Sequence, residues 1–302
     1  MHLHQTPEFV SRNLLDSLLI QTYKNFKIFI RDDGSSDSTV SILEAYSQKN
    51  SNEIILLTDD YGNIGVAKSF KLLMKNVDSD FYLFADQDDI WEFNKIEKLI
   101  EIAQLAKTEE PYLVFSNMSI FYSSEKENTD FFKKYFIKYK KIENGLFRGV
   151  ISGCLMLVNN KAKLKSLELN QNSNMLHDWD MYISTYLFGK IELTHEKLIK
   201  HRIHENNFVG ENLEKSTLIL IKDLIKYLFK SEFYRKIVFE YYFEYVSNCI
   251  MSIDNNLRLK KEFFTENEIN NLSYFKRKKW YLKHFNPFIY GKINGLLILM
   301  TF

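Results

Sequence analysis

The sequence predicts an α/β fold in which helices flank a mostly parallel β-sheet. Three short apolar runs, at residues 26–30, 53–58 and 81–89, alternate with two segments of helical spacing. This order of strand, helix, strand, helix and strand is typical of a parallel sheet with right-handed crossovers. Acidic residues follow the first run and end the third, where open α/β sheets bind their ligands. The 302 residues suffice for one such domain and an extension.

Each element follows from local spacing. Leu14, Leu15, Leu18 and Leu19 predict a helix over residues 9–20. After the strand at 26–30, Asp37 or Ser38 caps a helix that runs to about Ser47. The other expected elements are a strand at 53–58, helices at 66–76, 95–107 and 177–188, strands at 81–89, 112–116, 149–158 and 191–194, and an irregular or helical insertion at 122–144.

The composition changes near residue 211. Residues 211–302 hold 15 Lys or Arg against 10 Asp or Glu, and their helical segments are rich in aromatic residues. We therefore expect a core domain at 1–210 and a helical C-terminal extension at 211–302. Basic residues beside aromatic ones, at 276–281, favour contact with an anionic membrane surface. The alternative is that these helices simply pack on the core.

Charge and cysteine content narrow the class of protein. Lys and Arg total 40 and Asp and Glu total 39, a balance that argues against binding of nucleic acid. Cys154 and Cys249 fit no metal or disulfide spacing and suit a reducing compartment. Residues 1–20 lack the pattern of a secretory signal, and no window reaches about 18 uninterrupted apolar residues. We expect a cytoplasmic protein.

Three carboxylates, Asp86, Asp88 and Asp89, end the third apolar run. Acids this close together repel one another unless a positive charge lies between them. Oxygen ligands favour a hard divalent cation such as Mg²⁺ or Mn²⁺. The alternative is a solvated acidic turn that caps the helix beginning near Asn94.

Six ordered motifs carry a resemblance to a known family. The chain resembles family 2 glycosyltransferases of the GT-A fold over residues 9–210, and is most similar to the rhamnosyltransferase-like branch of bacterial surface-polysaccharide synthesis. The motifs are Arg31-Asp32-Asp33-Gly34-Ser35-Ser36-Asp37, Asp86-Gln87-Asp88-Asp89-Ile90-Trp91, Asn63-Ile64-Gly65-Val66, Ser152-Gly153-Cys154, His177-Asp178-Trp179 and Arg202-Ile203-His204, with Gln21-Thr22-Tyr23 in further support.

The resemblance implies a nucleotide-sugar donor and a divalent metal, Mg²⁺ or Mn²⁺. Asp33 matches the acid that contacts the nucleotide base, Asp32 lies beside it, and Asp86 faces the ribose. Asp88 matches the acid that reaches the metal. The late motif brings His204 near the metal and diphosphate. Further site residues implied by the same motifs are Asp89, Trp91 and Arg202.

The resemblance also implies that Asp178 is the catalytic base. An acceptor hydroxyl is a poor nucleophile, so a carboxylate must take its proton. One such carboxylate implies direct displacement and inversion at the anomeric carbon. The implied reaction moves rhamnose or another hexose to a saccharide or lipid-linked acceptor, at the inner face of the bacterial plasma membrane. The alternative role for Asp178 is an N-cap on the following helix.

The start of the chain departs from the family pattern. Residues 1–8 show no strand alternation where the family has its first strand. We therefore expect the first strand to be missing, which leaves open an inactive relative that acts as a scaffold. A phosphohydrolase with Asp86 as nucleophile is a third interpretation, but Ile90 and Trp91 fit that class poorly.

Overall fold

The computed structural model describes residues 2–3, 8–87, 89–106, 108–122, 129–130, 152–169 and 176–203. All of them belong to one compact unit, Met1–Ile203. Most of the expected insertion at 122–144 and the whole C-terminal extension at 211–302 lie outside the described residues. The domain boundary at residue 210 therefore stays a prediction.

A small parallel sheet holds the first three strands, in the order β1-β2-β3. They are β1 (His2–Leu3), β2 (Ile28–Asp32) and β3 (Ile54–Leu56). His2 pairs with Arg31 and Leu3 with Asp32. The expectation that the first strand is missing is therefore wrong, since residues 2–3 form a short strand. This strand depends on pairing with β2, which the alternation of residues 1–8 cannot reveal.

A larger sheet has the order β4-β8-β6-β9-β5, and β7 pairs with β6 beside this path. Only β6 and β9 run parallel, whereas the other pairs are antiparallel. A mostly parallel sheet is therefore a wrong prediction for this part, because β8 runs back between β4 and β6. The strands are β4 (Phe81–Leu83), β5 (Asp89–Trp91), β6 (Tyr112–Tyr122), β7 (Thr129–Asp130), β8 (Met156–Asn159) and β9 (Lys190–Ile203).

The apolar run predicted as one strand at 81–89 breaks in two. Strand β4 ends at Leu83, and β5 begins at Asp89 and pairs with β9. Between them the Asp89 amide donates to the Asp86 carbonyl at 3.3 Å, which closes a turn. The turn brings Asp86 and Asp89 close together in space, which a continuous strand would not do.

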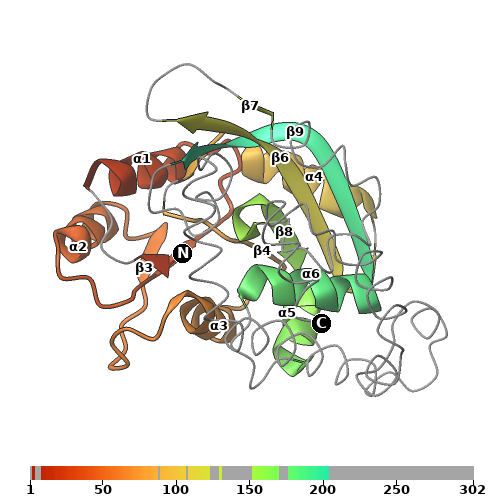
Figure 1. Cartoon of the computed structure of the whole chain (residues 1–302), viewed down its shortest axis with the longest axis horizontal. Coiled ribbons are helices and arrows are strands. Elements are labelled where there is room, and N and C mark those ends of the chain that lie inside the picture. The colour runs from red at the N-terminus through yellow and green to blue at the C-terminus, as the bar shows by residue number, and fades with distance from the viewer. Residues whose placement is uncertain are drawn as a thin grey trace, which may run out of the picture. The chain divides into compact units, whose positions relative to one another are not determined.

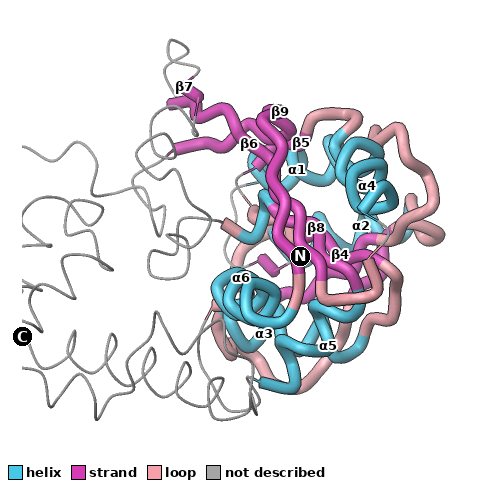
Figure 2. Tube along the Cα trace, turned by 90° about the vertical axis from the view of Figure 1, so that its right-hand side faces the viewer, coloured by secondary structure: helices cyan, strands magenta, loops and turns pink. Residues whose placement is uncertain are grey.

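Six helices are described around these sheets (Figure 1). Helices α3, α5 and α6 contact one another and group on one side of β4 and β8 (Figure 2), whereas α4 packs on β6 and α1 packs on β5. The helices are α1 (Glu8–Leu19), α2 (Thr39–Lys49), α3 (Val66–Asn76), α4 (Lys95–Ala106), α5 (Asn160–Leu169) and α6 (His177–Phe188). The expected helices at 66–76, 95–107 and 177–188 are confirmed, but α5 was not predicted.

The centre of the core is formed by β6 and β8. Leu113, Val114 and Phe115 of β6 and Leu157 and Val158 of β8 are fully buried. A short 3₁₀-helix, Gly153–Leu155, leads directly into β8, so the strand expected at 149–158 is confirmed only from Met156 on. This rigid centre fixes the position of residues 152–155. Within the described residues, every helix is too short or too polar to cross a bilayer.

Candidate active site

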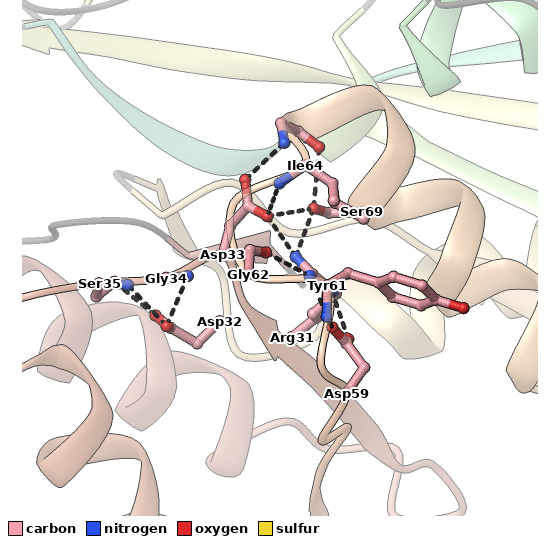
Figure 3. A network of polar contacts seen from close by, with 11 residues as sticks. Arg31, Asp32, Asp33, Gly34, Ser35, Asp59, Tyr61, Gly62, Ile64 and Ser69 are labelled. Atoms are coloured by element: carbon pink, nitrogen blue, oxygen red, sulfur yellow. Dashed lines mark hydrogen bonds and ion pairs between the residues drawn. The ribbon is translucent and has the colours of Figure 1, made fainter.

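Asp33 follows β2 and is engaged through both carboxylate oxygens. Its Oδ1 pairs with Arg31 and accepts a hydrogen bond from the Ile64 amide at 2.8 Å, and its Oδ2 accepts one from the Gly65 amide at 2.8 Å (Figure 3). Gly65 has φ of 81°, a conformation that favours glycine. Asp33 is only 1% exposed. In this structure Asp33 therefore fixes the turn before α3, and its predicted contact with a base stays a prediction.

Arg31 holds the same turn from the other side. Its side chain is 1% exposed and forms a two-pronged contact with Asp59, through Nε at 2.8 Å and Nη2 at 3.0 Å (Figure 3). Nη2 also donates to the Gly62 carbonyl at 2.7 Å. The hydrogen bond from Arg31 holds the pKa of the Asp59 carboxyl below its usual value. Two-pronged Arg–carboxylate contacts are directional, so Arg31 restricts the 59–65 loop to one conformation.

Asp32 is partly exposed and organises the turn that follows β2. One of its oxygens accepts hydrogen bonds from the Gly34 amide at 3.0 Å and the Ser35 amide at 2.8 Å. Short acidic side chains often close such turns. Asp32 and Asp33 thus shape the two loops at the carboxyl end of β2, where a parallel sheet presents ligand sites.

Helix α3 connects these loops to the predicted base through three consecutive residues. Ser69 Oγ lies 3.2 Å from Asp33 Oδ1, the Phe70 ring stacks on His177 with centroids 3.8 Å apart, and Lys71 pairs with Asp180 at 3.6 Å. His177 and Asp180 belong to the first turns of α6. The acidic turn after β2 and the start of α6 therefore share one supporting helix.

Asp178 lies in the first turn of α6, beside the 3₁₀-helix. Its Oδ2 accepts a hydrogen bond from the Gly153 amide at 3.3 Å, and its Oδ1 accepts one from the Trp179 amide at 2.7 Å. Burial raises the pKa of Asp178 to about 6, although the amides of Trp179 and Gly153 act in the opposite direction. The N-cap position of α6 is occupied by Leu176, so Asp178 is not the N-cap. A carboxylate with this pKa can accept a proton near neutral pH.

Gly153 allows the close approach between α6 and the 3₁₀-helix. A Cβ at this position would lie 2.5 Å from His177 Nε2 and 3.4 Å from Asp178 Cβ. The His177 ring has little room to move away because it is stacked against Phe70 and lies 4.8 Å from the Phe84 ring. The absence of a side chain at residue 153 therefore sets the place of Asp178.

Asp86 contacts the residue that precedes Gly153. Its Oδ2 accepts a hydrogen bond from Ser152 Oγ at 3.1 Å, and the next residue, Gly153, donates to Asp178. Two consecutive residues thus contact two predicted site acids that are far apart in sequence. The structure brings Asp86 and Asp178 together around Ser152 and Gly153.

Asp86 and Asp89 also form a candidate cation site with Cys154. One potential ligand atom from each of the three residues lies within 4.8 Å of the others. Asp89 is 1% exposed, and among the described residues its Oδ2 has no hydrogen-bond partner. Burial raises the pKa of the Cys154 thiol well above its usual value, which disfavours the thiolate. The two carboxylates therefore fit a hard divalent cation better than a soft one.

The other predicted site residues lie at the ends of β5 and β9 or outside the described residues. Asp89 Oδ1 lies 2.7 Å from His201 Nδ1, and the two residues are paired in the β5–β9 register. Arg202 is next in β9 and is partly buried. Trp91 is 5% exposed, so it belongs to the core beneath the site. The predicted metal ligands Asp88 and His204 lie outside the described residues, so their roles stay predictions.

Sequence reasoning missed Arg31, Lys95 and His201 as site residues. Arg31 and Lys95 are fully buried cations beside acidic clusters. Arg31 lies within an apolar strand, and Lys95 begins a helix that follows an acidic turn. These positions are signals by which both residues could have been found in the sequence. No local signal identifies His201, because its contact with Asp89 depends on the pairing of β5 with β9.

Comparison with known proteins supports one family. The model of "Glycosyl transferase family 2" matches residues 11–161. An uncharacterised glycosyltransferase of Rickettsia typhi is 28% identical over 199 residues, which cover 64% of this chain and 60% of that protein. The dTDP-rhamnosyl transferase RfbG of Shigella flexneri is 28% identical over 218 residues, which cover 66% of this chain and 70% of that protein. The chain thus spans about three fifths of the length of the Rickettsia typhi relative and of a second Rickettsia relative.

Solved structures show the same fold. S. aureus TarS in complex with UDP-GlcNAc has a TM-score of 0.58 at 16% identity, over 92% of this chain and 77% of that one. The mannosyltransferase PcManGT from Pyrobaculum calidifontis, in complex with GDP-Man and Mn²⁺, has a TM-score of 0.56 at 10% identity, over 99% of this chain and 73% of that one. These identities establish the fold alone, which is an α/β fold of the GT-A type. Since the family model covers half of the chain, the protein belongs to glycosyl transferase family 2.

Proposed function

We propose that this protein is an inverting glycosyltransferase. It moves a hexose, such as rhamnose, from a nucleotide diphosphate to a saccharide or lipid-linked acceptor in the synthesis of a bacterial surface polysaccharide. The observation that carries this proposal is the position of Asp86 and Asp178 on the two neighbouring residues Ser152 and Gly153. This arrangement puts a donor-side acid and a candidate base within one small region.

Asp178 takes the proton of the acceptor hydroxyl in this proposal. Its carboxylate is held by the Gly153 and Trp179 amides, so its orientation is fixed before the acceptor arrives. A positioned base of suitable pKa accelerates such reactions by about 10²–10⁴-fold. Asp180 does not compete for this role because it is fully buried and paired with Lys71.

The donor lies, in this proposal, between the turns that hold Asp32, Asp33 and Asp86. The Arg31 contacts keep the 59–65 loop in place, so the wall of the nucleotide site is formed before binding. Asp86 and Asp89, with Asp88 and His204, hold a divalent cation, Mg²⁺ or Mn²⁺. A cation bound there stabilises the negative charge that develops on the leaving diphosphate. Support for this donor class comes from TarS and PcManGT, whose complexes contain UDP-GlcNAc and GDP-Man.

Direct displacement follows from a single base on the acceptor side. A double-displacement route needs a second carboxylate placed to attack the anomeric carbon. In this proposal Asp178 is the base, and Asp86 and Asp89 hold the cation, so none of the three attacks the anomeric carbon. The proposal therefore predicts inversion, which NMR of the product linkage can test.

The test of the proposed function is the variant Asp178→Asn. Loss of the base should lower sugar transfer by about 10²–10⁴-fold, while donor affinity measured by calorimetry changes by less than about twofold because Asp178 does not hold the donor. Asp78→Asn, at an exposed acid before β4 and outside the proposed site, is the control and should leave both unchanged. An equal loss of donor affinity in Asp178→Asn would make Asp178 a binding residue.

Assays of the wild-type protein separate an enzyme from a scaffold. An inactive relative would show no transfer and no donor hydrolysis with any sugar nucleotide, in the presence of Mg²⁺ or Mn²⁺. The two-residue strand β1, paired in register with β2, favours the enzyme because the donor-side sheet edge is not bare there.

A further inference from the structure

His201 and Asp89 face each other across two paired strands. His201 is paired with Asp89 of β5 on one side and with Ile120 of β6 on the other, so its backbone is held from both sides. The Asp89 amide also donates to the Asp86 carbonyl, which closes the turn before β5. Groups on regular elements are placed more precisely than groups on loops. The side chains of His201 and Asp89 therefore meet in a fixed geometry.

The contact between these two side chains is a short hydrogen bond. His201 Nδ1 lies 2.7 Å from Asp89 Oδ1. Because an ionised carboxylate only accepts hydrogen bonds, the proton lies on His201 Nδ1. An imidazole can carry this proton with or without a positive charge, so the contact does not require a charged ring. The Asp89 side chain is 0% exposed and the His201 side chain is 21% exposed. A partly exposed ring thus holds one oxygen of a fully buried carboxylate.

The other oxygen of Asp89 lacks such a partner. Among the described residues, the buried Oδ2 atom accepts no hydrogen bond. Leaving a buried carboxylate oxygen unpaired is costly, and native structures usually provide a partner. One oxygen of Asp86, one oxygen of Asp89 and Cys154 Sγ all lie within 4.8 Å of one another. A hard divalent cation shared with Asp86 would supply the missing partner of Asp89.

We propose that His201 is a positioning residue for the candidate cation site. By holding Oδ1 of Asp89, it fixes the rotation of the carboxylate and leaves Oδ2 for Mg²⁺ or Mn²⁺. Hydrogen-bonding partners of this kind orient metal ligands, and their loss costs about 10–100-fold in metal affinity. This inference rests on the proposed function, in which Asp86 and Asp89 hold the cation together with Asp88 and His204. His201 itself touches neither the cation nor the sugar and acts only through Asp89.

The experiment measures Mn²⁺ binding to the full chain by electron paramagnetic resonance of the free ion. His201→Leu removes the donor and should weaken Mn²⁺ binding by about 10–100-fold. His201→Asn keeps an amide donor near the position of Nδ1 and should restore most of the affinity. His195→Leu, at an exposed position of the same strand, is the matched control and should bind Mn²⁺ as the wild type does. Unchanged Mn²⁺ affinity in a folded His201→Leu protein, or a wild type that binds no Mn²⁺, would overturn the proposal.

A double-mutant cycle shows whether His201 acts through Asp89. Asp89→Asn alone should weaken Mn²⁺ binding. His201→Leu added to Asp89→Asn should cause little further loss, because the carboxylate that His201 orients is already gone. Additive losses would mean that His201 acts on the cation by another route, such as direct ligation, and the positioning role would be wrong.

His201→Gln keeps the test decisive if His201→Leu does not fold. The Gln amide lies one bond farther from the backbone than that of Asn, near the position of Nε2, so His201→Gln should bind Mn²⁺ more weakly than His201→Asn. The reverse order would contradict the proposal. Sugar transfer is assayed separately. A protein with the expected Mn²⁺ affinities but no transfer would fail the proposed function and keep this inference, whereas transfer with Mn²⁺ affinity independent of His201 would do the opposite.

Discussion

As the proposed catalytic base, Asp178 needs its negative charge, and its pKa of about 6 sets the pH at which it has that charge. An unperturbed aspartate is ionised above about pH 4, so its activity would be level from pH 5 to 7. We expect kcat/KM for transfer to fall about tenfold from pH 7 to pH 5, because the protonated carboxyl of the free enzyme cannot accept a proton. Circular dichroism at both pH values checks that folding is unchanged. A level profile would show that Asp178 is ionised throughout this range.

Gly153 offers a second test at the residue scale. Gly153→Ala adds a methyl group 2.5 Å from His177 Nε2, and the stacked ring cannot yield without displacing Phe70. Overpacking of this kind costs about 1–3 kcal/mol. We expect a lower free energy of unfolding together with a large loss of transfer, since Asp178 moves with His177.

The double variant Gly153→Ala with His177→Ala is the control for this mechanism. If the clash with the ring is the cause, the loss of stability in the double variant should be clearly less than the sum of the two single losses. Additive losses would mean that the new methyl group acts elsewhere.

Single acids were predictable from the sequence, but their partners were not. Asp33 precedes Gly34 and Ser35 in a turn after a predicted strand, Asp86 lies at the end of an apolar run, and Asp178 was assigned by its place among the ordered motifs. In the sequence Arg31 and Lys95 resemble ordinary surface charges, yet both are fully buried in the structure. Their burial depends on distant neighbours, such as Cys154, which lies 59 residues after Lys95. The spacing of residues along the chain does not predict such contacts.

At the scale of elements, the loop between β3 and α3 depends on Arg31. Arg31→Met removes the contacts with Asp33 and Asp59 and leaves the buried Asp33 carboxylate without its cation. Breaking a buried pair in this way costs about 3–5 kcal/mol. We expect this loss in urea unfolding followed by tryptophan fluorescence.

Lys98→Met is the matched control for Arg31→Met. Lys98 pairs with Glu101 at 3.1 Å on the surface of α4. Exposed pairs contribute little to stability because water and salt screen them, so this variant should unfold almost as the wild type does. A similar small effect for Arg31→Met would show that the loop does not need the guanidinium.

Helices were easier to predict than strands. The expected segments at 66–76 and 177–188 match α3 and α6, because helical spacing and start signals are local. Strand β5 was hidden within a longer apolar run, since its start is set by pairing with β9 more than 100 residues later. Hydrophobic periodicity cannot distinguish one buried strand from two that are joined by a turn.

At the scale of the whole molecule, the C-terminal extension stays a prediction. Deletion of residues 276–302 should move the protein from the membrane fraction to the soluble fraction, because the deleted segment contains the basic and aromatic cluster at 276–281. Fractionation of cells that express each form measures this.

A milder variant supports the same test. Replacement of Lys276, Arg277, Lys278 and Lys279 by Gln keeps the length and should reduce binding to vesicles that contain anionic lipid, most strongly at low salt. Unchanged fractionation and vesicle binding would favour helices that pack on the core.

Ser69, Phe70 and Lys71 occupy one stretch of α3 and reach, in order, the acid after β2, the ring of His177 and the acid Asp180. A change of nucleotide preference that reshapes the first contact therefore also disturbs the other two. In homologues that have exchanged one nucleotide for another, these three positions and the head of α6 should vary as a group, with substitutions at one compensated at the next. Under the proposed function, donor choice and proton removal would then be inherited together, which would limit how freely the fold can be adapted to new nucleotide sugars.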